Sequence, residues 1–145
     1  MKPLAQECKR AVMAALAGTM LMIAGCSTMG GGGATPLSGA QEVPPNPSSA
    51  TGHGKIRIGP DKSVNGGLTF TGMLGTAAHI HEAPAGANGP VIIALTKTSD
   101  TSFAVPPGVS LTDAQYASYL AGNLYVNVHS AAYPGGEIRA QLKPK

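Results

Sequence analysis

The sequence predicts an all-β domain, a Greek-key-like β-sandwich or barrel with one short crossover helix. Three observations lead to this fold class. Apolar residues occur in short runs that alternate with polar ones, which is the pattern of half-buried strands. Glycine and proline account for 20 and 12 of the 145 residues, and they separate these runs at expected turns. Only residues 112–122 combine the capping residues and the length of a helix.

Alternation also predicts which residues of each strand face the core. The expected inward residues, in chain order, are Ile56, Ile58, Leu68, Phe70, Ile80, Val126, Val128, Ile138, Ala140 and Leu142. Residues 91–95 (VIIAL) contain no polar side chain, so we expect this strand to be buried on both faces. The segments at residues 59–62 and 84–90 carry the glycine and proline that are typical of turns.

The expected helix has a start signal and a stop signal. Thr112 is followed three residues later by Gln115, which together form a capping box. Gly122 suits the left-handed conformation that commonly ends a helix. We therefore expect a short helix over residues 113–121 that crosses over between two strands.

The first 25 residues are expected to be an export signal outside the fold. Basic residues precede an uncharged apolar run, residues 11–25, that is shorter than the roughly 20 residues a membrane span needs. Residues 23–26 (IAGC) resemble the lipobox of bacterial lipoproteins. The resemblance implies a lipid on Cys26, an anchor on the periplasmic side of the envelope and, from Ser27, the outer membrane. The alternative is a soluble secreted protein whose Cys26 merely lies near the cleavage site.

The rest of the chain divides into a glycine-rich tether, residues 26–36, and one domain, residues 37–145. The signal holds three of the ten basic and one of the seven acidic residues, which leaves seven against six. This near-neutral balance gives no indication of nucleic-acid binding. Both cysteines, Cys8 and Cys26, precede the domain, so it contains no disulfide and no thiolate-ligated metal.

By side-chain alternation, three histidines lie on strand faces that point away from the expected core. In the expected strand of residues 77–81, His79 and His81 point away from the face that holds Ile80. His129 ends a later strand with the same outward parity. We therefore expect three imidazoles on outer sheet surfaces, where neutral rings can bind a metal ion. A thiol-free histidine set favours Cu(II), with Zn(II) second.

Other residues are candidates for the surroundings of such a site. His53 also has outward parity and is either a fourth ligand or a solvent-exposed histidine. Glu82 could accept an imidazole N–H, and Arg139 could attract a small anion near the metal, although both are also explained as surface charges. For the three histidines, the alternative is structural hydrogen bonding to loops around Asn88 and Asn127.

Three motifs closely resemble those of the CHRD (chordin) domain family. They are LSGAQEVPP at residues 37–45, AAHIH at 77–81 together with GANGPV at 86–91, and GNLYVNVH at 122–129 together with PGGEIR at 134–139. The motifs follow the family order and extend over nearly the whole domain. The resemblance implies an extracytoplasmic β-sandwich-like domain but no established activity, because bacterial members are mostly named for the domain alone.

Residues 79–82, with His129 on a late strand, are also similar to the copper strands of copper/zinc superoxide dismutases, over these short pieces only. Three hypotheses follow. The first is a non-enzymatic, membrane-tethered periplasmic domain that binds copper and acts in envelope metal handling. The second is a copper-dependent enzyme of the superoxide dismutase type. The third is a structural or adhesion module that binds another envelope protein. A homodimer that completes the metal site is compatible with the first hypothesis.

Overall fold

A computed structural model describes residues 33–144 of the chain, so the expected signal, Cys26 and most of the expected tether lie outside the described residues. Within this range the chain forms an antiparallel sheet, a short 3₁₀ helix η1 (Gly39–Gln41) and an α-helix α1 (Asp113–Leu120). The strands are β1 (Thr35–Ser38), β2 (Thr51–Ile58), β3 (Val64–Thr71), β4 (Ala77–Glu82), β5 (Val91–Ala94), β6 (Thr96–Ser99), β7 (Ser102–Ala104), β8 (Leu124–His129) and β9 (Ile138–Leu142).

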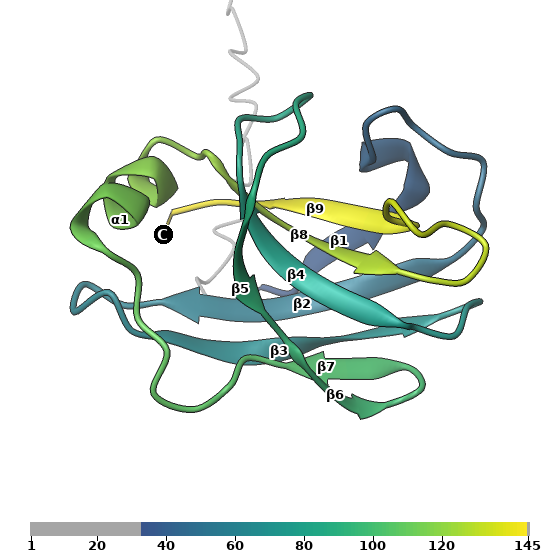
Figure 1. The fold of residues 1–145 in the computed structure, drawn as a ribbon, viewed down its shortest axis with the longest axis horizontal. Coiled ribbons are helices and arrows are strands. Elements are labelled where there is room, and N and C mark those ends of the chain that lie inside the picture. Colours follow the sequence, from purple (N-terminus) through teal and green to yellow (C-terminus); the bar gives the residue numbers. More distant parts are fainter. Residues whose placement is uncertain (1–32, 145) are drawn as a thin grey trace, which may run out of the picture.

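The sheet curls into a nearly closed barrel-like shape (Figure 1). Its strand order is β5-β4-β8-β9-β1-β2-β3-β7-β6. The two outermost strands of this order, β5 and β6, are consecutive in the sequence and are separated by one residue, Leu95. The N–H of Leu95 donates to the carbonyl oxygen of Ala78. The all-β class with one short crossover helix is therefore confirmed.

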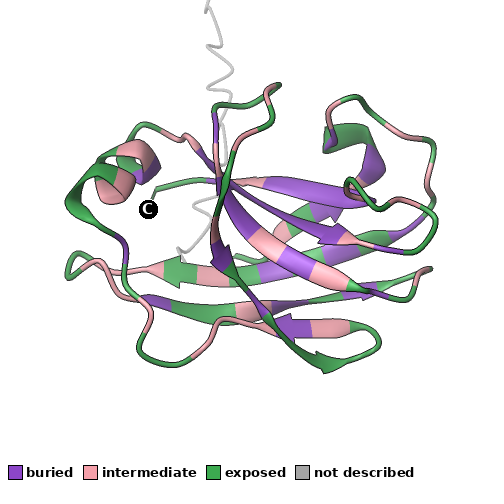
Figure 2. Ribbon diagram, in the orientation of Figure 1, coloured by how far each residue is buried: buried purple, intermediate pink, exposed green. Residues whose placement is uncertain are grey.

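The core lies inside this curled sheet, and alternation predicts its residues well. Ile80, Val126, Val128 and Ile138 have no exposed surface. The remaining expected inward residues of β3 and β9 are also buried, and purple dominates β8 and β9 in Figure 2. The two expected inward isoleucines of β2 are only partly buried, because they pack at the margin of the core near the β2–β3 turn.

The expectation that residues 91–95 are buried on both faces is wrong. Ile93 and Leu95 are buried, whereas Val91 is 50% exposed and Ala94 is also exposed. The reason is the position of β5, which pairs only with β4 and therefore lies at an edge of the sheet with one face open to solvent. An apolar run does not distinguish an edge strand from a central one.

Three strands have no clear signal in the sequence. β1 begins at Thr35, inside the expected tether, and contains a proline. The four residues of β6 are all exposed and polar or charged, and β7 has only three residues. These strands form because neighbouring strands complete their hydrogen bonds, an effect that local patterning does not report.

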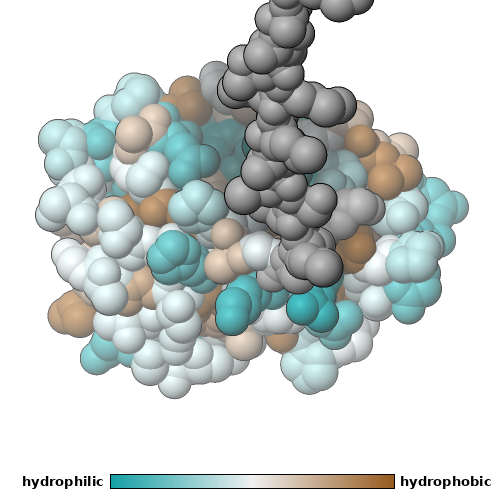
Figure 3. Space-filling model, turned by 180° about the vertical axis from the view of Figure 1, so that it is seen from behind, coloured by the Kyte–Doolittle hydropathy of each residue, from teal (hydrophilic) through white to brown (hydrophobic). Residues whose placement is uncertain are grey.

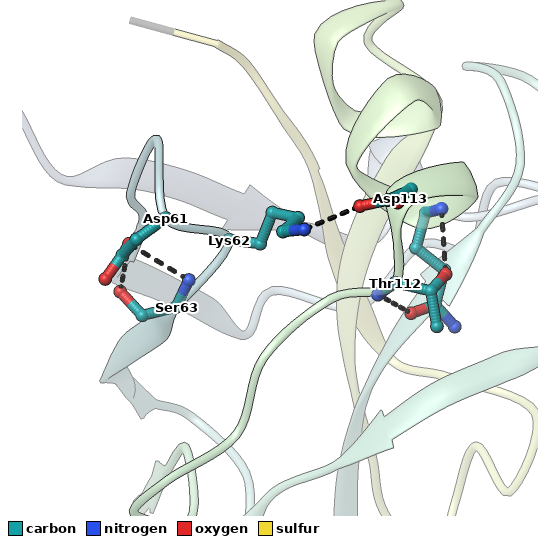
Figure 4. Close-up of polar contacts among 6 residues, drawn as sticks. Asp61, Lys62, Ser63, Thr112 and Asp113 are labelled. Atoms are coloured by element: carbon teal, nitrogen blue, oxygen red, sulfur yellow. Dashed lines mark hydrogen bonds and ion pairs between the residues drawn. The ribbon is translucent and has the colours of Figure 1, made fainter.

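The helix α1 has the expected start (Figure 4). The side chain of Thr112 accepts a hydrogen bond from the backbone N–H of Gln115, and the side-chain oxygen of Gln115 accepts one from the backbone N–H of Thr112. Lys62, in the β2–β3 turn, forms an ion pair of 2.6 Å with Asp113 at the first turn of the helix. The helix ends at Leu120, one residue earlier than expected, and Gly122 has a φ of 78°.

Replacing Thr112 with alanine should lower the free energy of unfolding by about 1 kcal/mol, because the capping hydrogen bonds are lost. Urea denaturation followed by circular dichroism measures this change. Thr112→Ser keeps the acceptor oxygen and should stay within about 0.5 kcal/mol of the wild type. Equal losses in both variants would contradict the assignment of the cap as the cause.

The surface offers few apolar groups. On the face shown in Figure 3, outside the atoms drawn in grey, hydrophobic residues form small separate areas among polar ones. The large exposed hydrophobic residues of the described range are Leu74, Val91 and Leu120, which come from different elements. No helix within residues 33–144 has the length and apolar character needed to cross a membrane.

Candidate metal centre

The pairing of β4 with β8 brings the three expected histidines together. His79 lies opposite Asn127, His81 lies opposite Tyr125, and Ala77 lies opposite His129. Side chains alternate along both strands, so the three imidazoles share the face opposite to the core. His129 is therefore the diagonal neighbour of His79 across the two strands.

The three side chains are close enough to serve as ligands of one ion. One ring nitrogen from each of His79, His81 and His129 lies within 4.8 Å of the other two. The shortest separation joins Nδ1 of His79 to Nε2 of His129, at 3.0 Å. Nitrogen ligands of a metal at roughly 2.0 Å are about 3.3 Å apart in tetrahedral geometry, so small side-chain movements suffice for binding.

Backbone carbonyl groups fix the orientation of two of the rings. Nδ1 of His129 lies 2.9 Å from the carbonyl oxygen of Pro134, and Nδ1 of His81 lies 3.0 Å from that of Gly89. In a neutral ring, a proton on Nδ1 leaves the lone pair on Nε2. Such a carbonyl partner behind the ring is the usual support of a metal-binding histidine.

The Nε2 atoms already have partners in the protein. Nε2 of His129 lies 3.0 Å from Nδ1 of His79 and, when His129 carries its proton on Nδ1, accepts a hydrogen bond from the Nδ1–H of His79. Nε2 of His81 lies 3.0 Å from Oδ1 of Asn127. The alternative interpretation from the sequence, hydrogen bonding near Asn127, thus describes part of the geometry, and a metal would have to replace these two contacts.

The histidine face is less exposed than the sequence predicts. His81 is 8% exposed, and Tyr125, Asn127 and Arg139 on the same face are buried as well. The loop of residues 83–90 covers this face, since two of its backbone carbonyls accept from Arg139 and Gln141. His79 and His129 are half-buried and form the accessible side of the cluster.

Burial favours the neutral form of these two accessible rings. Desolvation lowers the pKa of His79, and repulsion from His129 and His81 adds to the effect. Desolvation also lowers the pKa of His129, although the hydrogen bond to Pro134 acts in the opposite direction. Neutral imidazole is the form that binds metals, so both rings are ready for coordination near neutral pH.

Beneath the cluster, His81 and Arg139 both stack on Tyr125. The rings of His81 and Tyr125 are 4.7 Å apart at their centroids and nearly parallel, at 4°. The guanidinium carbon of Arg139 lies 3.3 Å from the centroid of Tyr125. Its Nη atoms also donate to Oδ1 of Asn88 and to the carbonyl oxygen of Ala87. This stack supports the ring of His81 from below.

The other expected site residues lie elsewhere or have different roles. His53 is exposed on β2, paired with Pro36 and Thr69, and is not part of the cluster. Glu82 points to the opposite face and accepts from Ser118 of α1, not from an imidazole. Arg139 is only 1% exposed, so it presents no cation to an anion in solvent.

Sequence reasoning missed Glu42 as a neighbour of this site. Glu42 follows η1 and is 5% exposed, and its Oε1 atom has no hydrogen-bond partner. Desolvation raises the pKa of Glu42 to about 7, against the opposing effects of Arg139, the Val43 backbone and the Asn127 amide. Its place within the 37–45 motif was the only signal available, and that motif does not indicate what the carboxyl contacts.

Comparison with known proteins gives one match. The model of the CHRD domain family matches residues 34–142. No curated protein and no solved structure matches the chain.

Proposed function

The chain belongs to the CHRD domain family, and from this premise we propose that it is a lipid-anchored envelope protein that binds one copper ion. The ligands are His79, His81 and His129. The observation that carries the proposal is the convergence of these three rings on one sheet face, two of them with carbonyl-bonded Nδ1 atoms. The function is to hold or deliver copper in the cell envelope, without catalytic turnover.

The donor set supports copper over other metals. A site of neutral imidazoles without thiolate or carboxylate ligands suits Cu(II), and Zn(II) follows in affinity. The lowered pKa of His79 and of His129 means that protons compete with the metal only at a lower pH than in an ordinary histidine site. Binding to these two rings should therefore persist somewhat below pH 6.5.

Location rests on the amino-terminal segment. The lipobox-like residues 23–26 support a lipid on Cys26, and the domain would then lie on the periplasmic side, with Ser27 favouring the outer membrane. Lipidation with several acyl chains gives the stable anchoring that a single chain does not. In such a compartment a thiol-free site has the advantage that oxidation does not remove its ligands.

The test is Cu(II) binding by the full, untagged chain. Calorimetry should give one ion per chain, and electron paramagnetic resonance should show coupling to imidazole nitrogen. His79→Ala should weaken binding by about a hundredfold, since the loss of a supporting residue alone typically costs 10- to 100-fold. His53→Ala is the matched control, because His53 lies outside the cluster, and it should bind as the wild type does.

Equal affinity of the wild type and His79→Ala would contradict the proposed site. An absence of bound copper at equimolar metal would leave the interaction module as the remaining hypothesis. A Zn(II) titration under the same conditions should give a weaker complex, in keeping with the Irving–Williams order.

A further inference from the structure

A buried chain of polar groups leads from the proposed metal ligand His81 to the carboxyl of Glu42. Nδ1 of His81 faces the carbonyl oxygen of Gly89, and Nε2 faces Oδ1 of Asn127, each at 3.0 Å. Nδ2 of Asn127, which lies beside the carboxyl of Glu42 next to Gly136, in turn donates to that carboxyl. Asn127 is 2% exposed and Glu42 is 5% exposed, so solvent does not complete these bonds.

Gly136 makes room for the contact between Glu42 and Asn127. A Cβ atom at this position would lie 2.5 Å from Oε1 of Glu42 and 2.7 Å from Nδ2 of Asn127. Its φ of 132° is also one that other residues rarely adopt. A glycine here lets the backbone approach both polar groups closely.

Counting donors shows that this series of hydrogen bonds needs one proton more than an ionised Glu42 and a neutral His81 provide. Its three hydrogen bonds are Glu42–Asn127, Asn127–His81 and His81–Gly89, and each needs one donor. Along the chain, the amide of Asn127 supplies one donor, and a neutral His81 supplies another. Both ends, an ionised carboxylate and a backbone carbonyl, only accept. The third donor must come from a proton on Glu42 or on His81.

The carboxyl of Glu42 is the better place for this proton. His81 and Arg139 both stack on the ring of Tyr125, so they occupy its two faces. A charged His81 would therefore be a second buried cation next to Arg139, and it would also adjoin His79. A proton on Glu42 requires the side-chain amide of Asn127 to be reversed, with its oxygen and nitrogen exchanged. Protonated Glu42 then donates to Oδ1 of Asn127, and Nδ2 of Asn127 donates to Nε2 of His81. This arrangement leaves Nδ1–H of His81 for Gly89 and places the lone pair on Nε2.

We propose that copper binding at His81 releases the proton of Glu42, so that this buried acid couples metal affinity to pH. The proposal rests on the proposed function. The metal takes the lone pair of Nε2 and breaks the Asn127–His81 contact. Two hydrogen bonds then remain: Asn127 donates to the ionised Glu42, and Nδ1–H of His81 donates to the carbonyl oxygen of Gly89. The O–H bond of Glu42 breaks, and the proton leaves to solvent as the metal–nitrogen bond forms.

The groups around Glu42 are consistent with release of its proton when the metal binds. Arg139 of β9 is the charged neighbour that favours the ionised carboxylate, together with the backbone N–H of Val43. Tyr133 of the β8–β9 loop lines the same cavity as Glu42. Glu137, which follows Gly136 in the sequence, accepts a hydrogen bond from Ser48. The positive charge of the bound metal adds to the effect of Arg139.

The experiment is calorimetry of Cu(II) binding to the full chain at pH 7, in two weakly coordinating buffers of different ionisation enthalpy. The difference in heat gives the number of protons released per ion. Glu42 has a pKa of about 7 in the metal-free protein, so the wild type should release about half a proton more than Glu42→Gln. Glu137→Gln, a buried acid without a connection to His81, is the matched control and should match the wild type.

A second measurement covers the case in which Glu42→Gln does not fold. In the wild type, carbon NMR of the Glu42 carboxyl should give a midpoint near 7 without metal and a clearly lower midpoint with Zn(II), which is diamagnetic. Equal proton release in both proteins, or a midpoint unchanged by Zn(II), would overturn the coupling and leave the metal site intact. A wild type that binds neither metal would overturn the proposed function, and the coupling with it.

Discussion

Replacing Arg139 with methionine should lower the free energy of unfolding by about 3 to 5 kcal/mol, because two hydrogen bonds from a charged donor are lost, each typically worth about 1.5 to 3 kcal/mol. Arg139 is the largest of the fully buried side chains in the described range. Methionine fills much of the same volume but provides no donors. Oδ1 of Asn88 and the carbonyl oxygen of Ala87 would then lose their donor, and Tyr125 would lose the stacked cation.

Urea denaturation of the purified protein measures this loss, and two variants make the result specific. Arg57 is exposed on β2, so Arg57→Met should change the free energy of unfolding by less than about 0.5 kcal/mol. Arg139→Lys keeps the charge but not the planar group that stacks and donates twice, so it should still be strongly destabilised. A loss in Arg139→Met no larger than in Arg57→Met would show that the buried network contributes little to stability.

The inward faces of the strands could be predicted because side-chain alternation is a local property of extended backbone. Ile80, Val126 and Val128 have the expected orientation, and the shared parity of His79 and His129 follows from the same rule. The capping box of α1 is equally local, since it involves residues three positions apart. Short-range patterns therefore account for most elements of the fold and for the composition of the histidine cluster.

The covering of the histidine face could not be predicted in this way. Parity indicates which side of the sheet a residue occupies, but it does not indicate what lies above that side. Arg139 has the parity of an exposed residue, yet the loop of residues 83–90 buries it and satisfies its guanidinium. Glu42 contacts Asn127 from a segment far away in the sequence, and only the tertiary fold brings them together. The same limit explains why β5 was expected to be buried on both faces, because its position at the sheet edge is a property of the topology.

The second large effect concerns pH. In the metal-free protein, the stability of the wild type relative to Glu42→Gln should fall by about 2 to 3 kcal/mol between about pH 5 and pH 8.5. Burial raises the pKa of Glu42 from 4.5 to about 7 in the folded state. The folded protein therefore binds more protons than the unfolded chain between these values. The stability associated with the protonated carboxyl is complete below the unfolded pKa and is lost as the pH rises through the folded one.

The comparison with Glu42→Gln is needed because other groups titrate in the same range. His79 and His129 have a lowered pKa in the folded protein, so they make the protein more stable as the pH rises toward 6.5. Their contribution is common to both proteins and cancels in the difference. The carboxylates of Asp61, Asp100 and Asp113 also have a lowered pKa, and they titrate at a more acidic pH.

Urea denaturation at a series of pH values, with a chelator present, gives this difference directly. Glutamine has nearly the shape of a protonated glutamate and can donate to Oδ1 of Asn127 as that acid does, but it cannot ionise. At pH 8.5 the variant should therefore be the more stable protein, because the wild type must keep a desolvated carboxylate whose Oε1 has no partner. Glu137→Gln is the control for the loss of a buried carboxylate outside this chain of hydrogen bonds. A difference between the wild type and Glu42→Gln that stays constant with pH would mean that Glu42 is ionised throughout this range. The third donor that the buried hydrogen bonds between Glu42 and Gly89 require would then have to come from a charged His81.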